Sequence, residues 1–333
     1  FFDTEIPGVI GLVFFIFLFM RAIDQQRSLR SSLLYSLGAA AALAYFIAGW
    51  GAAYYMLDLT AVFVFVLLIL KRYNQRLLIT YSVTFGVALL VATKVPYIGL
   101  GYLTSAPVIP VAAVFLLLII AEILRHNISA KTKLTITVAT VTAIIVSIVP
   151  LWILGYLGAI AGKFVSVLDP FVRSAAPLIA SVAEHRISAW GNLYLELGIS
   201  ILFFLLGLYF ALKNPTNRNI FLLIFSATTL YFASSMVRLL VIFAPAFAIL
   251  TAMGILGVLK PFITLLKEAP NVGVKAKRKL AKVSKEYSGL AIFLIFLIVV
   301  TNVAFSPQSG GMPRVYGSAY VPTSISSSTT KGP

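Results

Sequence analysis

The chain has 333 residues, of which 60% are hydrophobic and only 11% are charged, and its mean hydropathy is +1.01. This composition excludes an ordinary soluble domain and is typical of a membrane protein. The absence of cysteine excludes a disulfide framework and any thiolate metal site.

Continuous apolar stretches recur along the chain, and a helix needs about 20 mostly apolar residues to cross a bilayer. Strands of a membrane barrel would instead be short and alternating. The sequence therefore predicts an all-α polytopic membrane protein with about ten transmembrane helices. We place these spans at 6–23, 32–49, 53–70, 77–95, 107–124, 134–155, 194–212, 219–235, 239–259 and 289–305.

The net charge of +16 could indicate a nucleic acid partner, but its distribution argues against one. Nineteen of the 26 Lys and Arg residues fall in the loops after the first, third, fifth, seventh and ninth spans. By the positive-inside rule these loops are cytoplasmic and the loops between them lie outside. We expect a multi-pass protein of the cell membrane with an extracellular active face. The basic cluster at 260–285 indicates a loop facing anionic lipid headgroups, with docking to a cytoplasmic protein as the alternative.

The chain opens with FFDTEIPGVIG, without an initiator Met or a basic signal-peptide region, and we expect it to be a fragment. Asp3 and Glu5 precede a helix that Pro7 indicates, since proline suits the first helical turn. These two acids either complement the positive end of the helix or supply oxygen ligands to a hard divalent cation.

The second span ends in FIAGWGAAYYMLDL, which the topology places outside. Trp50, Tyr54 and Tyr55 fit an aromatic belt at the headgroup level. Asp58 is a functional candidate, because ionisable groups within spans are costly and usually serve a purpose.

A long outer segment, 156–193, contrasts with the other outer loops, which are short. The spacing of its apolar residues predicts an amphipathic helix on the membrane surface, which Pro170 and Pro177 end. Glu184, His185 and Arg186 follow in the stretch LIASVAEHRISAW, in a chain otherwise poor in charge. Glu184 is either a solvated loop acid or part of a site.

Arg238 lies at the outer end of two spans joined by almost no loop. A lipid phosphate and a substrate phosphate would serve it equally well, since the planar guanidinium suits phosphate oxygens. The outer face thus gathers carboxylates for a metal and an arginine for an anion. Metal-assisted transfer from a phosphate leaving group needs this combination.

Four motifs, in order, resemble the catalytic subunit of oligosaccharyltransferase. SVAEHRISAW is similar to the SVSEHQ-type motif of the family's fifth external loop, and MVRLLVIFAP to its MVRLMLTLTP stretch. IAGWGAAYYMLDL resembles SAWGGYVFITNL, and FFDTEIPGVIGL resembles the second acidic motif. The likeness runs from residue 1 to about 260, and the short cytoplasmic loops resemble archaeal members.

The resemblance implies a GT-C type glycosyltransferase membrane domain over 1–306, with its external loop at 156–193 and the start of an external soluble domain or linker at 307–333. The enzyme would move an oligosaccharide from a polyprenyl (dolichyl) phosphate or diphosphate to Asn of an Asn-x-Ser/Thr sequon. Its partners would be the lipid-linked oligosaccharide, a sequon-containing polypeptide and membrane lipids, with no nucleic acid. Additional subunits are not specified.

The resemblance also assigns roles to single residues. Asp3, Glu5 and Glu184 would be catalytic and would bind Mg²⁺ or Mn²⁺, with Glu184 also contacting the acceptor amide and His185 beside it in the acceptor loop. The lipid-linked oligosaccharide would be held by four residues: Arg238 at its phosphate, and Trp50, Tyr55 and Asp58 along its groove.

Two residues depart from the family pattern, and two motifs are expected outside this stretch. Arg186 stands where the eukaryotic motif has Gln, and Asp58 where Asn is usual, which affects acceptor and donor details. The family's first acidic motif would lie upstream of residue 1, and its WWD sequon-reading motif after residue 333. Since the family has thirteen spans, we expect an enzyme core that is inactive alone.

Two other classes fit less well. Another membrane glycosyltransferase using polyprenyl-phosphate sugars would share the outer carboxylates but has no reason to carry SVAEHR and MVRL together. A transporter predicts midplane acids, broken helices and an internal repeat, none of which the sequence shows.

Overall fold

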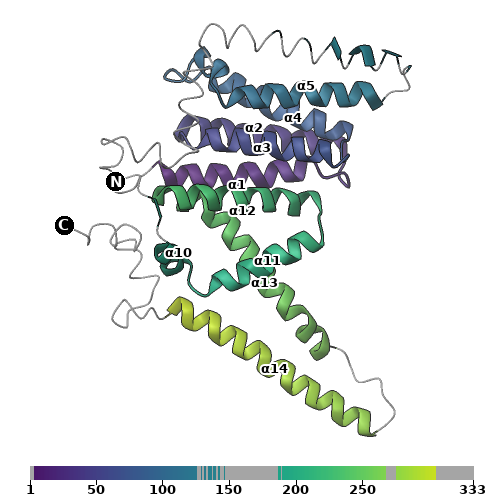
Figure 1. Ribbon diagram of the computed structural model, residues 1–333, viewed down its shortest axis with the longest axis vertical. Coiled ribbons are helices and arrows are strands. Elements are labelled where there is room, and N and C mark those ends of the chain that lie inside the picture. Colours follow the sequence, from purple (N-terminus) through teal and green to yellow (C-terminus); the bar gives the residue numbers. More distant parts are fainter. Residues whose placement is uncertain are drawn as a thin grey trace, which may run out of the picture. The chain divides into compact units, whose positions relative to one another are not determined.

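The structure is a computed structural model (Figure 1), which describes residues 4–125, 187–188, 190–267 and 275–304, with some separate residues between 129 and 146. The chain divides into two compact units, Phe1–Leu168 and Asp169–Pro333, which are described here one at a time. The predicted span 134–155 lies largely outside the described residues. The amphipathic helix expected in 156–193, its prolines and the tail 307–333 lie wholly outside them.

The described residues of unit 1 include five long helices and one short 3-10 helix, and each of these long helices begins and ends within three residues of a predicted span. Figure 1 shows the long helices side by side, and α2 packs against both α1 and α4. Pro7 lies in the first turn of α1, as expected. The elements are α1 (Glu5–Ala22), α2 (Leu29–Gly49), α3 (Ala53–Ile69), α4 (Gln75–Ala92), η1 (Leu100–Thr104) and α5 (Val108–Arg125).

Side-chain caps and hydrogen bonds fix one end of this unit. Ser28 and Asn74 cap α2 and α4 by accepting hydrogen bonds from the backbone N–H groups of Ser31 and Leu77. Such caps satisfy amide groups that a helix leaves without partners at its start. At the same end, the buried hydroxyl of Ser32 donates to the carbonyl oxygen of Ala22 over 2.5 Å. These hydrogen bonds therefore hold the turns at this end against the helices that they join.

Unit 2 contains α10 (Trp190–Leu197), α11 (Ser200–Lys213), α12 (Asn217–Ser235), η3 (Val237–Leu239), α13 (Leu240–Lys267) and α14 (Lys275–Ala304). The predicted span 194–212 is not one continuous helix, because the helix is interrupted between Leu197 and Ser200. Gly198 has a φ of +58°, and its N–H donates to the carbonyl of Tyr194 over 2.7 Å. Glycine ends helices in this way because it enters the left-handed region without a Cβ penalty.

The predicted cytoplasmic loop at 260–285 is also largely helical. Helix α13 continues to Lys267 and α14 begins at Lys275, so only 268–274 separates them. Lysine, arginine, alanine and leucine are good helix formers in water. Hydropathy located the apolar half of each helix but not its charged extension.

Glycines let α11 and α13 pack closely in unit 2. A Cβ atom on Gly207 would lie 1.9 Å from the carbonyl oxygen of Leu250, and one on Gly254 would lie 1.9 Å from that of Phe203. Beside this crossing, the ring of Phe204 packs edge-on against Phe243. Small residues at helix crossings are typical of membrane proteins, in which van der Waals contact replaces the hydrophobic effect between helices.

Five helical segments among the described residues are long and apolar enough to cross a bilayer. Two further apolar helices, α3 and α11, are shorter. Large apolar side chains such as Phe14 and Leu34 are exposed on the unit 1 helices, as expected for surfaces that face lipid. The chain is thus a helical multi-pass membrane protein. The segments are Glu5–Ala22, Leu29–Gly49, Gln75–Ala92, Val108–Arg125 and Val237–Thr264.

Candidate functional site

The predicted site residues fall into three groups. Glu5, Trp50, Tyr55 and Asp58 lie in unit 1, and Arg238 lies in unit 2. The remaining residues are outside the described part of the chain, namely Asp3, Glu184, His185 and Arg186. The structure therefore places the donor-side candidates and leaves the predicted metal site untested.

Trp50 packs against the first turns of α1. It follows α2 in extended conformation, and its N–H donates to the carbonyl of Phe46 over 2.9 Å. A Cβ atom on Gly8 would lie only 2.3 Å from Cε3 of the indole ring. Gly8 is three residues after Glu5, which is one helical turn. The contact brings a predicted donor residue close to the helix start that carries a predicted metal ligand.

Glu5 begins α1 and is half-buried. An acidic side chain in a first turn interacts favourably with the positive end of the helix dipole. This position fits both interpretations of Glu5 from the sequence, since carboxylate oxygens are also preferred ligands of hard cations.

An aromatic cluster covers the start of α3. The ring of Tyr54 stacks on Tyr102 of η1, with centroids 5.3 Å apart and an angle of 15° between the planes. The hydroxyl of Tyr97 donates to the carbonyl of Ala48. Burial raises the pKa of the Tyr102 hydroxyl above its usual range, and electrostatic interactions with neighbouring acidic groups raise it further. The segment between α4 and α5 is thereby held against the turn that contains Trp50.

Sequence reasoning missed Tyr97 and Tyr102, because it assigned 96–106 only to a short outer loop. The segment YIGLGYLTSAP carries the available signal, aromatic residues spaced by glycines between two spans. Whether such residues reach a neighbouring helix depends on tertiary contacts that the sequence pattern does not contain.

Asp58 lies in the second turn of α3 and is half-buried. Its Oδ1 atom is buried and has no hydrogen-bond partner among the described residues. Buried polar atoms normally have partners, so each exception needs an explanation. Tyr55, which precedes Asp58 on the same helix, is also half-buried. A polar ligand group at this end of unit 1 would supply the hydrogen bond that Asp58 Oδ1 lacks.

Arg238 is exposed in η3, the short turn between α12 and α13. Its neighbour Val237 is buried, which anchors the turn and leaves the guanidinium on the surface. The sequence expectation of almost no loop between these spans is confirmed. An arginine on a rigid, apolar-anchored turn is well suited to bind a phosphate.

Ser188 connects the chain just after the EHR motif to the end of α12. Its backbone N–H donates to the carbonyl of Ser234 over 3.0 Å, and its Oγ donates to the carbonyl of Ala233 over 2.6 Å. Ser188 is buried, with 8% of its surface exposed. Sequence reasoning missed this residue, because a serine in a loop carries no signal of its own.

Among the described residues, no group of three or more His, Asp or Glu side chains is arranged to hold a metal. Two of the three predicted ligands, Asp3 and Glu184, lie outside the described residues. The chemistry of the three side chains still fits, since Mg²⁺ and Mn²⁺ prefer carboxylate oxygens.

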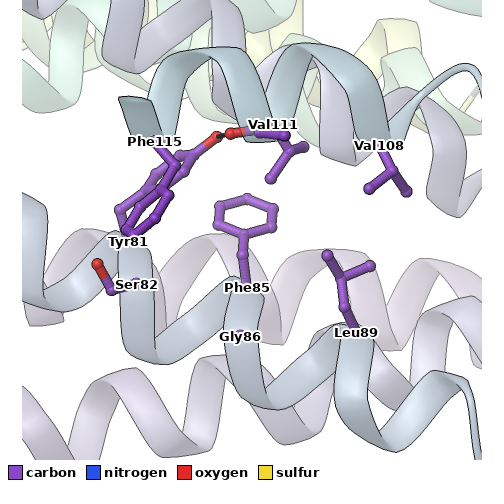
Figure 2. A pocket seen from close by; sticks show the side chains of 9 residues that line it. Tyr81, Ser82, Phe85, Gly86, Leu89, Val108, Val111 and Phe115 are labelled. Atoms are coloured by element: carbon purple, nitrogen blue, oxygen red, sulfur yellow. Dashed lines mark hydrogen bonds between the residues drawn. The ribbon is translucent and has the colours of Figure 1, made fainter. Parts of the chain in front are cut away.

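A groove of about 200 Å³ lies between α4 and α5. Figure 2 shows Phe85 and Leu89 of α4 facing Val108 and Val111 of α5 across it, while the hydroxyl of Tyr81 donates to the carbonyl of Val111 over 3.0 Å. The lining is almost entirely apolar and contains no charged side chain. The groove therefore offers no carboxylate, imidazole or amine for acid, base or metal chemistry.

Comparison with known proteins identifies similar families and folds. Residues 1–251 match the family model described as "Oligosaccharyl transferase STT3, N-terminal". The chain is 30% identical, over 301 residues, to the dolichyl-diphosphooligosaccharide–protein glycosyltransferase subunit STT3B of Arabidopsis thaliana, covering 87% of this chain and 40% of that protein. It is 28% identical to the subunit STT3 of Dictyostelium discoideum over 326 residues, covering 92% of this chain and 44% of that protein. The chain thus spans about two fifths of the length of these relatives.

Two solved structures of the oligosaccharyltransferase AglB from Archaeoglobus fulgidus share the fold. The complex with an inhibitory peptide and a dolichol-phosphate gives a TM-score of 0.54 at 18% identity, over 87% of this chain and 38% of that one. The apo form gives a TM-score of 0.59 at 16% identity, with the same coverage.

Proposed function

The chain belongs to the oligosaccharyl transferase STT3 family, and from this we propose that the whole protein transfers an oligosaccharide from a dolichyl-type phosphate or diphosphate carrier to Asn of Asn-x-Ser/Thr sequons. The family match over residues 1–251 carries the proposal. It spans the four motifs noted in the sequence, and neither another polyprenyl-phosphate glycosyltransferase nor a transporter is favoured by it.

We assign the donor phosphate to Arg238. Its guanidinium is exposed on a turn anchored by buried Val237, and arginine binds phosphate oxygens with two parallel hydrogen bonds. Phosphate oxygens gain charge as the bond to the sugar breaks, so this contact would strengthen in the transition state. Arg238 would thereby assist departure of the carrier.

The groove for the rest of the donor would be formed by Trp50, Tyr55 and Asp58. Trp50 offers an indole ring fixed against Gly8, and Asp58 offers a buried oxygen without a partner among the described residues. Aromatic rings and a carboxylate suit a ligand that is partly apolar and partly rich in hydroxyl groups.

Asp3, Glu5 and Glu184 are proposed as the ligands of Mg²⁺ or Mn²⁺. When bound, the cation would act as a Lewis acid that neutralises phosphate charge. Glu184 would also accept a hydrogen bond from the acceptor amide, and His185 would lie beside it in the acceptor loop. The support is the oxygen chemistry of the three side chains and the half-buried place of Glu5 at the start of α1.

The remaining proposals concern topology. We propose ten spans in a GT-C type membrane domain over 1–306, with an external loop at 156–193 and a linker or soluble domain from 307. The basic loops would face the cytoplasm, and the active face would be extracellular at the cell membrane. An impermeant thiol reagent tests this in intact cells, because a cysteine at position 97 should react and one at position 72 should not. The reverse pattern would overturn the orientation.

An archaeal origin is proposed from the short cytoplasmic loops. Sequence identity does not favour an archaeal origin, since it is 30% to the plant relative and 18% to the archaeal protein of known structure. The genes that flank this one in its genome would decide the origin, since archaeal neighbours would support it and eukaryotic ones would refute it.

The activity is tested with the full-length protein in detergent or nanodiscs. The assay follows a labelled oligosaccharide from its dolichyl carrier to a synthetic peptide containing Asn-Ala-Thr, with Gln-Ala-Thr as the matched control. Transfer to the Asn peptide alone, lost on chelation and restored by Mn²⁺ or Mg²⁺, is the expected result. Hydrolysis of the carrier without peptide glycosylation, or equal labelling of both peptides, would refute the proposal.

A further inference from the structure

Ser188, which lies outside α12, donates hydrogen bonds to backbone carbonyl groups at the end of that helix. A helix leaves its last four carbonyl groups without intrahelical partners. In α12 the carbonyl of Phe232 accepts from Met236, whereas those of Ala233 and Ser234 accept from Ser188, which is 45 residues away from Ala233 in sequence. Ala233 is fully buried and Ser234 is half-buried, so the Ala233 carbonyl in particular needs a protein partner in place of water. The backbone and side chain of one residue supply it.

The two sides of this connection carry different parts of the proposed site. On one side, Ser188 follows Arg186 by two residues and Glu184 by four. On the other side, α12 ends at Ser235 and continues directly into the turn that presents Arg238. Within unit 2, the Ser188 connection is thus the described contact that links the chain next to the acceptor motif with the chain next to the phosphate-binding arginine.

We propose that Ser188 is a positioning residue that ties the chain directly after the acceptor motif to the end of α12 and so to the turn of Arg238. The inference rests on the proposed function, since it assumes that these two elements bind acceptor and donor. Transfer requires the acceptor amide to approach the sugar carbon that the phosphate leaves, and small misplacements of reacting groups are costly. A short double hydrogen bond at a buried position limits such misplacement.

The test compares two replacements of Ser188, by Thr and by Val, that are isosteric with each other, in the full-length enzyme. Ser188→Thr keeps the hydroxyl, while Ser188→Val has the same shape and lacks it, so the pair isolates the bond to Ala233. Ser226→Ala serves as the matched control, because Ser226 is also buried in unit 2 and its Oγ donates to a backbone carbonyl, that of Leu223, within its own helix. All variants retain Arg238 and Glu184.

Kinetics give the first readout. Loss of one hydroxyl bond should raise the KM for the acceptor peptide about three- to tenfold in Ser188→Val, with the KM for the lipid-linked donor unchanged. Ser188→Thr should restore the acceptor KM, and Ser226→Ala should leave it at the wild-type value. Equal acceptor KM values for the Thr and Val variants would overturn the proposal, as would a parallel rise in both KM values.

A spin label gives a second readout that does not need activity. The 333 residues contain no cysteine, so a label on Ile187→Cys, whose side chain is 49% exposed, reports on this segment once cysteines elsewhere in the protein are replaced. The label should become more mobile in Ser188→Val than in Ser188→Thr or Ser226→Ala. Unchanged mobility would overturn the connection itself. A mobile label together with a wild-type acceptor KM would overturn the positioning role, whereas absence of transfer in the wild-type enzyme would refute the proposed function.

Discussion

Gly8 provides a sharp test of the donor groove, because it lies directly beneath Trp50. The change Gly8→Ala adds one methyl group at a point 2.3 Å from Cε3 and 2.9 Å from Cδ2 of the indole. Carbon atoms in contact are about 3.5–4.0 Å apart. The ring and α1 must therefore separate by more than about 1 Å.

Two terms of opposite sign decide the effect on stability. Overpacking of a fitted contact costs about 1–3 kcal/mol, while alanine gains about 1 kcal/mol over glycine inside a helix. The free energy of unfolding should thus fall by about 0–2 kcal/mol, which leaves the protein folded. Activity should respond more strongly, since a misplacement of about 1 Å in a binding group can cost a hundredfold.

The assay is initial-rate transfer with varied lipid-linked oligosaccharide, using the full-length protein. We expect kcat/KM for the donor to fall about ten- to a hundredfold in Gly8→Ala. Gly38→Ala in α2 is the matched control, because its new Cβ would meet only the Leu18 side chain, at ordinary distances of 3.4 Å to Cδ1 and 3.7 Å to Cδ2. The control should retain wild-type activity.

A double-mutant cycle separates the indole from other causes. Once Trp50→Ala has removed the ring, Gly8→Ala should have little further effect on donor kcat/KM. If Gly8→Ala costs as much in that background as in the wild type, its effect does not pass through Trp50, and our reasoning about the groove is refuted.

Three further predictions follow from single residues. Arg238→Lys should slow transfer or weaken donor binding about ten- to a hundredfold, because loss of one charge-assisted hydrogen bond costs about 1.5–3 kcal/mol; equal activity of the Lys variant in a donor titration would indicate a membrane anchor instead. Glu184→Ala should nearly abolish Mn²⁺- or Mg²⁺-dependent transfer, since it removes an anionic ligand, and full activity in a metal titration would return Glu184 to the role of a solvated loop acid. Gly207→Ala should destabilise the protein by about 1–3 kcal/mol or more, because the new methyl group would lie 1.9 Å from the carbonyl oxygen of Leu250. Thermal unfolding checks this against Gly289→Ala, which meets no atom within 4 Å, and equal stability of the two variants would contradict the close crossing.

The sequence alone determined the membrane class and the places of α1 to α5, because bilayer thickness dictates the length of an apolar helix. It also located Pro7 in the first turn of α1 and Arg238 in a short turn, since proline and abrupt changes in hydropathy act over a few residues. It went wrong at Gly198, where one glycine ends a helix inside an apolar run, and at Lys275, where a helix continues into charged residues.

The tertiary structure decided which distant residues meet. Trp50 lies on Gly8, Tyr54 stacks on Tyr102, and Ser188 binds the end of α12. None of these contacts follows from periodicity, which specifies the buried face of a helix but not the residue that packs against it. Such pairs depend on how whole helices pack and on which carbonyl groups remain to be satisfied at their ends. The sequence could therefore suggest that Trp50 and Arg238 have functions, while only the packed chain shows which neighbours hold them in place.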